Sequence, residues 1–443
     1  MKYTTLMSTD KMFASLIKLL IVIVLLSVLP LDLMADSVGC DDAFVQLDSD
    51  SLVIKVTGTG GDDTANIQCA LDVAVSTGIP TVALASGEFY ISSITIENFN
   101  GTLQGHTKTT TFINTRDRSV DCDLMISEGR EPSVIKFVKG EPRIRYMTIR
   151  ASHTCMGDYP ISNVLHFTGK SANSADCSND TLFGAVDRVI LDGLNIDNAP
   201  LTGVSVEPES TYLGGCQNTL LGTFKLNRST VQNFYWGVLT IMKSGAQVDI
   251  NFNEFHHSSQ AIGLYDTNQN TTITSNKFFG ENTPDYDYFA IAVNALDEAG
   301  PTTTRVVIDN NEFNVSSQAE SEWYSYAIAI HNHVRPVNVS CIVTNNRFNL
   351  TGPWTSGLYF DGVSNTHVSA NRFTGSAGEA ISVFADDAPA SGWTITANQG
   401  LASFSSAYGT DIYFGPGVSN SIVGPDQGTD LDDNGTNNTL LPQ

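Results

Sequence analysis

A histidine and two carboxylates recur in one frame of short apolar segments, where they could act on a common substrate. His331 and Asp361 end the segments Ala327–His331 and Gly357–Asp361, and Asp386 comes two residues after a third such segment. Strands stacked about 4.8 Å apart would place His331 and Asp361 on neighbouring strands, with Asp386 about 8 Å from Asp361. Carboxylates at that spacing leave room for a water molecule, which suits glycoside hydrolysis with inversion, and the histidine can orient or protonate. The competing interpretation is a solvated sheet face whose polar residues share no task.

Aromatic residues gather beside these three positions. Two long intervals in the chain, roughly Gly280–Phe289 and Ser316–Tyr326, are predicted to loop out side by side and form a wall. Aromatic faces next to carboxylates suit the binding of sugar rings. The candidate substrate-binding residues are therefore Trp323, Tyr359, Tyr286, His333 and Trp354. The alternative is that these aromatic side chains pack the loops against the body of the protein.

A repeat positions all of these residues. Five segments follow the frame apolar-x-x-Asn-x-Phe, a sixth lacks only the Phe, and the intervals between their asparagines run from 23 to 35 residues; the asparagines are Asn253, Asn276, Asn311, Asn346, Asn371 and Asn398. Short strands repeated at such intervals are typical of a solenoid whose units stack and share one core. Asparagine suits a buried turn better than a strand interior, and stacked amides can bond the turns above and below. We expect a buried asparagine ladder, with Ser229 in the slot before Asn253.

A second strand follows each frame, as in Ala261–Tyr265, Ala290–Asn294 and Ala327–His331. The second and fourth residues of each segment are apolar and predicted to point inward, and the third and fifth outward. The sequence therefore predicts an all-β fold, a single-stranded parallel β-helix of about ten to eleven coils with two or three strands per coil. Its domain would span residues 36–425, and the Asp- and Asn-rich residues 426–443 would form a loosely ordered tail that could also hold calcium.

Composition narrows the classes of partner. The chain has 443 residues and a net charge of −24, from 23 Lys plus Arg against 47 Asp plus Glu. This balance argues against nucleic acid as a partner. No cofactor is required, but loop carboxylates are hard oxygen ligands, so calcium is the one metal considered. We expect a monomer.

The N-terminus predicts export. Three lysines precede an uncharged run, Leu19–Leu29, which is too short to span a bilayer and suits a signal peptide over residues 1–35. A retained anchor and a lipoprotein linked at Cys40 are the alternatives. In an exported chain, cysteines form disulfides. We expect pairs Cys122–Cys155 and Cys177–Cys216, and Cys341 as a buried free thiol.

Residues 52–91 read as an N-terminal cap. A Gly-rich stretch leads into Asp62-Asp63-Thr64, an apolar helix stripe follows, and Ser86-Gly87-Glu88-Phe89-Tyr90-Ile91 reads as turn and strand. In these segments the chain resembles the pectate-lyase-like superfamily of right-handed parallel β-helix proteins. Asp62 and Asp63 are interpreted as helix-starting residues and not as catalysts.

The resemblance implies a secreted protein that acts on polysaccharide. We prefer a hydrolase in which Asp361 and Asp386 form the carboxylate pair and His331 assists. The first alternative is a uronate lyase, in which Asp266, Asp285 or Asp287 would hold calcium and His331 or Tyr359 would abstract the proton. The second is a non-catalytic glycan-binding or surface protein. The chain lacks most motifs of the polygalacturonase-like hydrolases and alginate epimerases, so its subfamily stays open.

Overall fold

The structure is a computed structural model of the whole chain. It describes residues 40–115, 133–151, 162–168, 181–187, 190–193, 201–206, 221–241, 247–265, 270–284, 286–295, 303–320, 323–332, 338–386, 388–401, 404–424 and 431–441. Residues 41–443 form one compact unit. The predicted signal peptide lies outside the described residues.

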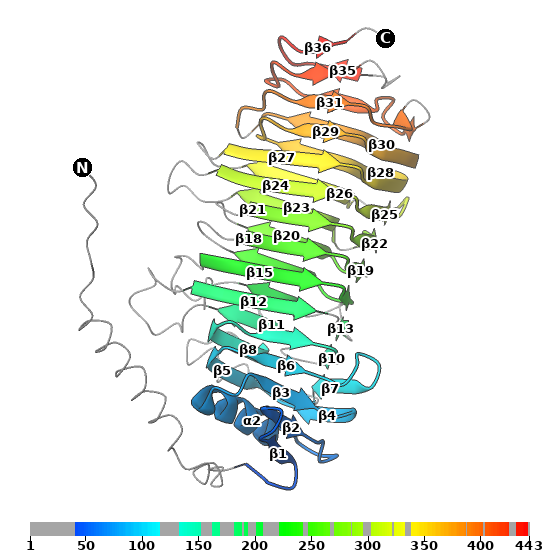
Figure 1. Cartoon of the computed structure of the whole chain (residues 1–443). Coiled ribbons are helices and arrows are strands. Elements are labelled where there is room, and N and C mark those ends of the chain that lie inside the picture. The colour runs from blue at the N-terminus through cyan, green and yellow to red at the C-terminus, as the bar shows by residue number, and fades with distance from the viewer. Residues whose placement is uncertain are drawn as a thin grey trace, which may run out of the picture. The chain divides into compact units, whose positions relative to one another are not determined.

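Three parallel sheets run the length of this unit, and most turns of the chain contribute one strand to each sheet (Figure 1). Sheet I contains β2 (Val53–Val56), β3 (Thr81–Leu84), β6 (Thr102–Gln104), β9 (Arg143–Arg145), β12 (Thr181–Asp187), β15 (Leu221–Asn227), β18 (Gln247–Asn251), β21 (Asn270–Thr274), β24 (Thr303–Asp309), β27 (Asn338–Thr344), β29 (His367–Ser369), β31 (Thr394–Thr396), β34 (Ile422–Val423) and β36 (Thr439–Leu440).

Sheet II contains β4 (Gly87–Ile91), β7 (Thr111–Thr115), β10 (Thr148–Ala151), β13 (Ile190–Gly193), β16 (Thr230–Gln232), β19 (Glu254–His256), β22 (Lys277–Glu281), β25 (Glu312–Ser316), the first halves of β28 (Arg347–Asp361) and β30 (Arg372–Phe384), and β32 (Ser405–Ser406). Sheet III contains β5 (Ile94–Phe99), β8 (Ser133–Gly140), β11 (Ser162–Thr168), β14 (Leu201–Val206), β17 (Trp236–Ile241), β20 (Gln260–Tyr265), β23 (Tyr288–Ala295), β26 (Ser325–Asn332), the second halves of β28 and β30, β33 (Ile412–Phe414) and β35 (Leu431–Asp433).

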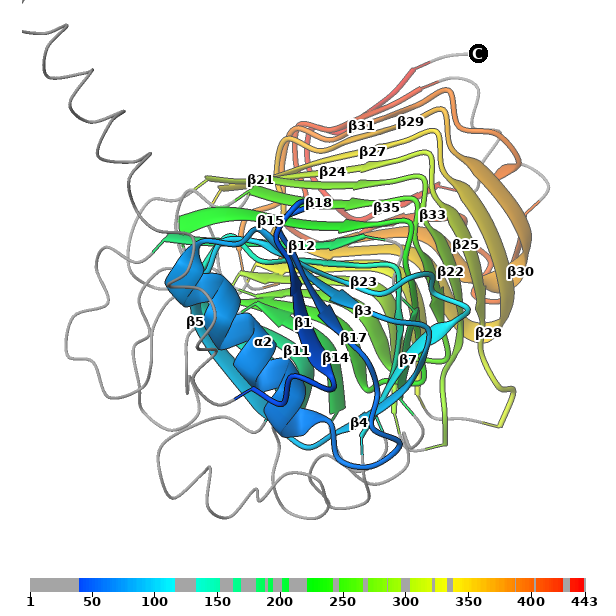
Figure 2. The same cartoon turned by 60° about the horizontal axis from the view of Figure 1, so that its bottom comes forward.

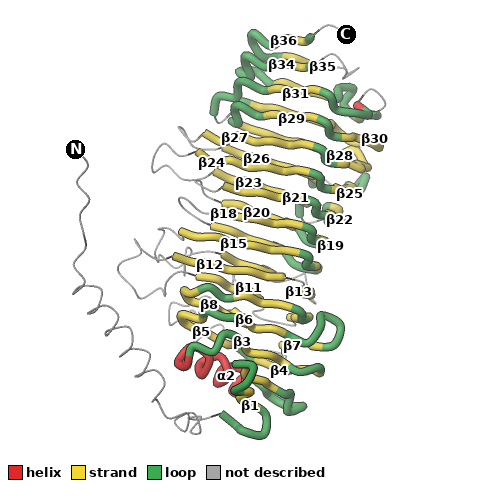
Figure 3. Tube along the Cα trace, in the orientation of Figure 1, coloured by secondary structure: helices red, strands yellow, loops and turns green. Residues whose placement is uncertain are grey.

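The predicted all-β parallel β-helix is confirmed, with three strands per coil. Figure 3 shows almost all of the described chain as strands and loops, with a single long helix at the N-terminal end of the stack. Apolar side chains of all three sheets point inward and fill one continuous core, as the alternation in the sequence indicates.

The N-terminal cap consists of α2 (Thr64–Thr77) and the antiparallel pair of β1 (Val45–Asp48) and β2. Figure 2 shows α2 lying across the first coils, beside β5. Asp63 precedes the helix, but its buried carboxylate accepts the backbone N–H groups of Thr59 and Tyr90 at 2.7 and 3.1 Å, and so ties the helix start to β4. Asp62 accepts the N–H of Thr64 at 3.0 Å. Both aspartates are therefore structural, as predicted.

The asparagine ladder occupies the turn between sheets I and II and is buried as predicted, with every member between 0% and 3% exposed. From Asn276 on, each Oδ1 accepts both the backbone N–H and the side-chain N–H of the asparagine one coil before it, as Asn346 does from Asn311 at 2.8 and 3.0 Å. Each Nδ2 also donates to a sheet I carbonyl, which for Asn346 is that of Ile308 at 2.9 Å. Ser229 fills the preceding slot, where its N–H donates to Asn253.

The residue before each ladder asparagine has left-handed backbone geometry, as at Asn310 and Asn345 with φ of 55° and 57°. Such a residue turns the chain sharply enough for the side chain that follows to point into the coil. The phenylalanines of the frame stack on one another behind the ladder, with ring centroids 4.7–5.1 Å apart from Phe255 to Phe373. The frame thus encodes both a turn and a core column.

The predicted loosely ordered tail is wrong for its described part. β35 pairs with β33, and β36 pairs with β34, so residues 431–440 add a further coil. The Asp- and Asn-rich composition hid this coil because its strands contribute few apolar residues. Asp433 instead accepts the N–H of Gly435 at 2.9 Å and holds a turn.

The predicted state of one cysteine, the free thiol of Cys341, is confirmed. Cys341 is a free, fully buried thiol, and Cys40 and Cys69 are each disulfide-bonded. The expected pairs Cys122–Cys155 and Cys177–Cys216 fall outside the described residues. Within the described chain, no helix has the length and apolarity needed to cross a membrane.

Candidate functional site

Two loops between sheets II and III stand side by side, as the long intervals predicted. The first follows β22 and the second follows β25, so they belong to successive coils. The side chain of Asn282 in the first loop donates to the carbonyl of Trp323 in the second, and the N–H of Tyr324 donates to the carboxylate of Asp287 at 2.6 Å. The Tyr288 N–H donates back to the Tyr324 carbonyl at 2.9 Å. These bonds make the two loops one wall.

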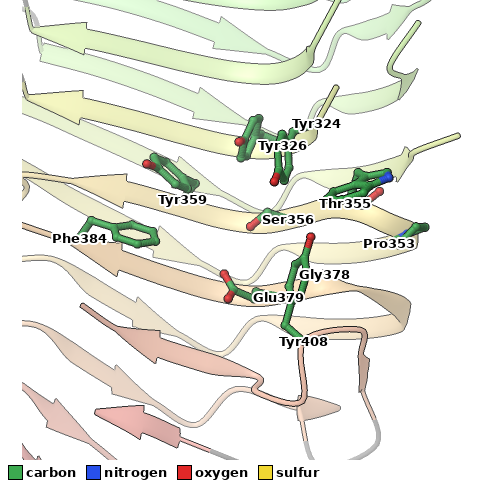
Figure 4. A pocket seen from close by; sticks show the side chains of 11 residues that line it. Tyr324, Tyr326, Pro353, Thr355, Ser356, Tyr359, Gly378, Glu379, Phe384 and Tyr408 are labelled. Atoms are coloured by element: carbon green, nitrogen blue, oxygen red, sulfur yellow. The ribbon is translucent and has the colours of Figure 1, made fainter. Parts of the chain in front are cut away.

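A pocket of about 360 Å³ opens at the C-terminal side of this wall, over β26, β28 and β30 (Figure 4). Its described lining combines six aromatic side chains with a few small and polar residues: Tyr324, Tyr326, Pro353, Trp354, Thr355, Ser356, Tyr359, Gly378, Glu379, Phe384 and Tyr408. The volume lies at the lower end of the roughly 300–1,000 Å³ of ligand pockets. The pocket can therefore hold a small molecule or a short part of a polymer.

The aromatic rings form a connected rim. Tyr326 contacts Tyr359 edge to face at 5.4 Å between centroids, and Tyr359 contacts Phe384 at 5.1 Å. On the loop side, Trp354 lies 5.4 Å from Tyr324 and 6.5 Å from Tyr408. Figure 4 shows the phenol oxygens of Tyr324 and Tyr408 pointing toward each other across the opening. Each ring of the rim therefore packs against at least one neighbouring ring.

Glu379 is the one carboxylate among the described lining residues. Its side chain accepts a hydrogen bond from the hydroxyl of Ser382. Burial raises the pKa of Glu379 above its ordinary value, the Ser382 hydrogen bond opposes this shift, and the negative charge of Asp432 adds to it. A partly buried carboxyl group that keeps its proton to higher pH is suited to act as a general acid.

A β-bulge turns Glu379 outward. The N–H groups of both Ala380 and Ile381 donate to the carbonyl of Asp411, at 3.2 and 3.0 Å, so two residues of β30 face one residue of the next coil. Strict alternation counted back from the inward Ile381 would point Glu379 into the core. The extra residue reverses that direction and places Glu379 beside Ser356, its register partner on β28.

Asp432 is the nearest candidate for a second carboxylate on this side. It belongs to the register column Ser382–Tyr413–Asp432 on successive coils, and Ser382 bonds Glu379. Two coil spacings separate the backbones of Ser382 and Asp432 by about 10 Å. Asp432 is exposed, so its carboxylate has access to water. The two carboxylates therefore differ in environment, as an acid and a base must.

The residues predicted as catalytic lie beyond the far end of this pocket. His331 and Asp361 are register partners on neighbouring coils, as predicted. Asp361, however, is only 5% exposed, and its Oδ1 accepts the backbone N–H of Asp386 at 3.0 Å. The expectation that Asp361, as the fifth residue of its segment, faces solvent is wrong, because its side chain is buried and holds the turn after β30. Asp386 is exposed, and none of the three lines the pocket.

Two of the predicted binding residues, Trp354 and Tyr359, line the pocket. Trp323 and Tyr286 do not. They are 42% and 40% exposed, and the Tyr286 ring contacts Tyr235 instead. Of the predicted group Trp323, Tyr359, His331 and Asp361, only Tyr359 lines this pocket. His333 lies outside the described residues.

Sequence reasoning missed Glu379, Ser356 and Tyr408. Glu379 and Ser356 precede the five-residue segments by one position, and the bulge conceals their direction. Tyr408 comes from a segment with little strand structure, and a Cβ on Gly378 would lie 2.9 Å from its ring, so a glycine permits the approach. An exposed-looking Glu immediately before an apolar segment was the available signal.

The described residues hold no group of three or more His, Cys, Asp or Glu side chains arranged to bind a metal ion. Of the aspartates considered as calcium ligands, Asp266 and Asp285 lie outside those residues. Asp287 has a pKa raised by burial and accepts the Tyr324 N–H, so its role is to join the loops.

Comparison with known proteins identifies the fold. Neither a protein-family model nor the sequence of a curated protein matches the chain. Among solved structures, the Dettilon tailspike protein gp208 superposes with a TM-score of 0.54 at 13% identity, covering 87% of this chain and 68% of that one. The DFA-IIIase from Arthrobacter chlorophenolicus A6 gives a TM-score of 0.49 at 9% identity, covering 87% of this chain and 96% of that one. The Streptococcus pneumoniae surface protein and adhesin PfbA gives 0.45 at 13%, covering 86% and 94%.

The likeness to the tailspike protein shows the fold alone. The chain is a right-handed parallel β-helix, the fold that the cap segments and the coil repeat predicted.

Proposed function

We propose that this protein binds a glycan in the aromatic pocket and hydrolyses a glycosidic bond there, with Glu379 as the general acid. The observation that carries the proposal is the position of Glu379, a partly buried carboxyl group with a raised pKa among six aromatic side chains. Aromatic faces bind the apolar faces of sugar rings, and a carboxyl group whose pKa is raised by burial can protonate a leaving-group oxygen.

The reaction follows the two-carboxylate scheme of glycoside hydrolysis. Glu379 donates its proton to the glycosidic oxygen as the bond from that oxygen to the anomeric carbon breaks. A water molecule attacks the anomeric carbon from the opposite face, and Asp432 accepts its proton. The products are two shorter chains, one with a new reducing end, and proton exchange with solvent returns both carboxyl groups to their starting states.

The catalytic residues predicted from the sequence offer a second candidate place for contact with the glycan. Asp386 is exposed and His331 is half-buried beside Tyr359, with ring centroids 5.1 Å apart, so these side chains could contact a longer chain that leaves the pocket. The burial of Asp361 argues against the pair Asp361 and Asp386 as the acid and base. A lyase and a glycan-binding protein without catalysis are the alternatives, and the same aromatic pocket would serve either of them.

Export of the protein is part of the proposal. The disulfide-bonded Cys40 and Cys69 support folding in an oxidising compartment. A polysaccharide outside the cell would then be the substrate.

Product analysis on a panel of polysaccharides tests the proposal. New reducing ends without ultraviolet-absorbing unsaturated ends indicate hydrolysis, unsaturated ends indicate a lyase, and binding without either indicates a binding protein. Glu379→Gln should lower turnover by roughly 10²–10⁴-fold. The matched control is Glu254→Gln, since Glu254 is an exposed carboxylate on β19, several coils away. Full activity of Glu379→Gln would refute the assignment.

A further inference from the structure

The charge of the pocket restricts which glycans it can accept. None of the described residues that line it is Lys, Arg or His, and the one carboxylic acid among them is Glu379. A protonated Glu379 is neutral, but Asp432 places a negative charge nearby, and the chain as a whole carries −24. A uronate carboxylate entering this pocket would lose water and meet like charge without a basic partner. An uncharged sugar ring meets neither cost.

The two small hydroxyl side chains of the pocket, Thr355 and Ser356, differ in their hydrogen bonding. The Thr355 hydroxyl already has a hydrogen-bond partner, because it donates to the Thr351 carbonyl at 2.7 Å. The Ser356 hydroxyl is buried and has no hydrogen-bond partner in the described structure. Ser356 and Glu379 are register partners on neighbouring coils, so the hydroxyl lies beside the carboxyl group (Figure 4). A buried hydroxyl without a partner at the edge of a pocket is positioned for a ligand group.

We infer that this pocket selects uncharged sugar rings over uronates, and that Ser356 is a specificity-determining residue that binds a ring hydroxyl. The inference rests on the proposed function and adds the substrate class. Glu379 protonates the glycosidic oxygen, and Ser356 adjoins Glu379. The sugar hydroxyl that Ser356 binds is therefore on the carbon next to the scissile glycosidic bond. The aromatic rim contacts the apolar faces of the same ring and leaves its edge to Ser356.

Matched polymers that differ only in charge test the substrate class. Polygalacturonate and polyguluronate are each compared with their carboxyl-reduced forms, at equal chain length, together with neutral glucans, mannans and xylans. Binding is followed by the fluorescence of Trp354, with Trp354→Phe as the control for the source of the signal, and turnover by new reducing ends. We expect the polymers that bind to be neutral. We also expect any carboxyl-reduced polymer that binds to have an affinity at least tenfold higher than that of its charged parent at low ionic strength.

A charged parent bound as tightly as its reduced form, or a uronate as the sole ligand, would overturn the inference while leaving hydrolysis at Glu379 intact. If no glycan on the panel changes the fluorescence or is cleaved, the proposed function itself fails.

The role of Ser356 has its own test, a double-mutant cycle between protein and substrate. An oligosaccharide of the preferred neutral polymer is compared with its analogue lacking the hydroxyl next to the scissile bond. The wild-type protein should lose about tenfold or more in kcat/KM on the deoxy analogue, and Ser356→Ala should treat the two substrates alike. Equal discrimination by wild type and Ser356→Ala would remove Ser356 from specificity. Thermal unfolding checks that Ser356→Ala is folded.

Discussion

Replacing Asn346 with alanine tests the asparagine ladder, because the structure specifies which groups lose their partners. The side-chain oxygen of Asn346 accepts the backbone N–H of Asn311 at 2.8 Å, and its amide donates to the carbonyl of Ile308 at 2.9 Å. Alanine offers neither group. Asn371 keeps one partner, since the backbone N–H of residue 346 still donates to its Oδ1.

Two buried backbone groups are therefore stranded, at about 1–3 kcal/mol for each. The expected loss in the free energy of unfolding is about 2–6 kcal/mol, with the low end reached if water enters the space. Equilibrium unfolding in urea, followed by circular dichroism, measures it as a fall in the midpoint at an unchanged slope.

The matched control is Asn349→Ala, three residues further along the same coil. Asn349 also bonds both neighbouring coils, donating to Asn314 at 2.8 Å and accepting from Thr374 at 2.6 Å, but its side chain is exposed. Water can replace these bonds, so the control should change stability by no more than about 0.5 kcal/mol. Equal midpoints for the two variants would refute the reasoning that burial gives the ladder its importance.

Four further predictions follow from single residues. Trp354→Ala should weaken glycan binding about tenfold, or 1.4 kcal/mol, without lowering the melting temperature, as measured by calorimetric titration and thermal unfolding. The pKa of Glu379 is raised in the folded state, so its contribution to stability is present at low pH and is lost as pH rises through that raised pKa; Glu379→Gln should flatten this part of the pH dependence of the melting temperature. Burial raises the pKa of the Cys341 thiol, so an alkylating reagent should modify it only after unfolding, and rapid modification of the native protein would contradict its position. Asp361→Ala should destabilise the protein by about 1–3 kcal/mol, because the Asp386 N–H loses its acceptor. The conservative Asp361→Asn should keep turnover, and loss of turnover by a folded Asp361→Asn protein would place the catalytic site at Asp361.

The fold was predictable from sequence because each coil repeats the same physical solution. The buried asparagine, the stacked phenylalanine and the alternating apolar strand recur in one frame, and every copy reports the same inward direction. Ser229 could be placed in the asparagine slot for the same reason. The last coil was missed because β35 and β36 are short and polar, and their pairing depends on the preceding coil more than on their own residues.

The site was predictable only in part. Tyr359 and Trp354 were found because they fall on the outward side of the repeat or next to the predicted wall. Glu379 was not, because the bulge at Ala380 breaks the alternation from which directions were counted. Asp361 shows the opposite error, since a residue on the outward side was assumed to be exposed, whereas the turn that contains Asp386 covers it.

The most direct test of the central claim is a crystal structure of the Glu379→Gln variant with an oligosaccharide of the polymer that the wild-type protein cleaves. We predict a sugar ring in contact with Trp354 and Tyr359, with its glycosidic oxygen within hydrogen-bond distance of residue 379 and water near Asp432. An oligosaccharide bound instead over Asp386 and His331, with the aromatic pocket empty, would contradict the account.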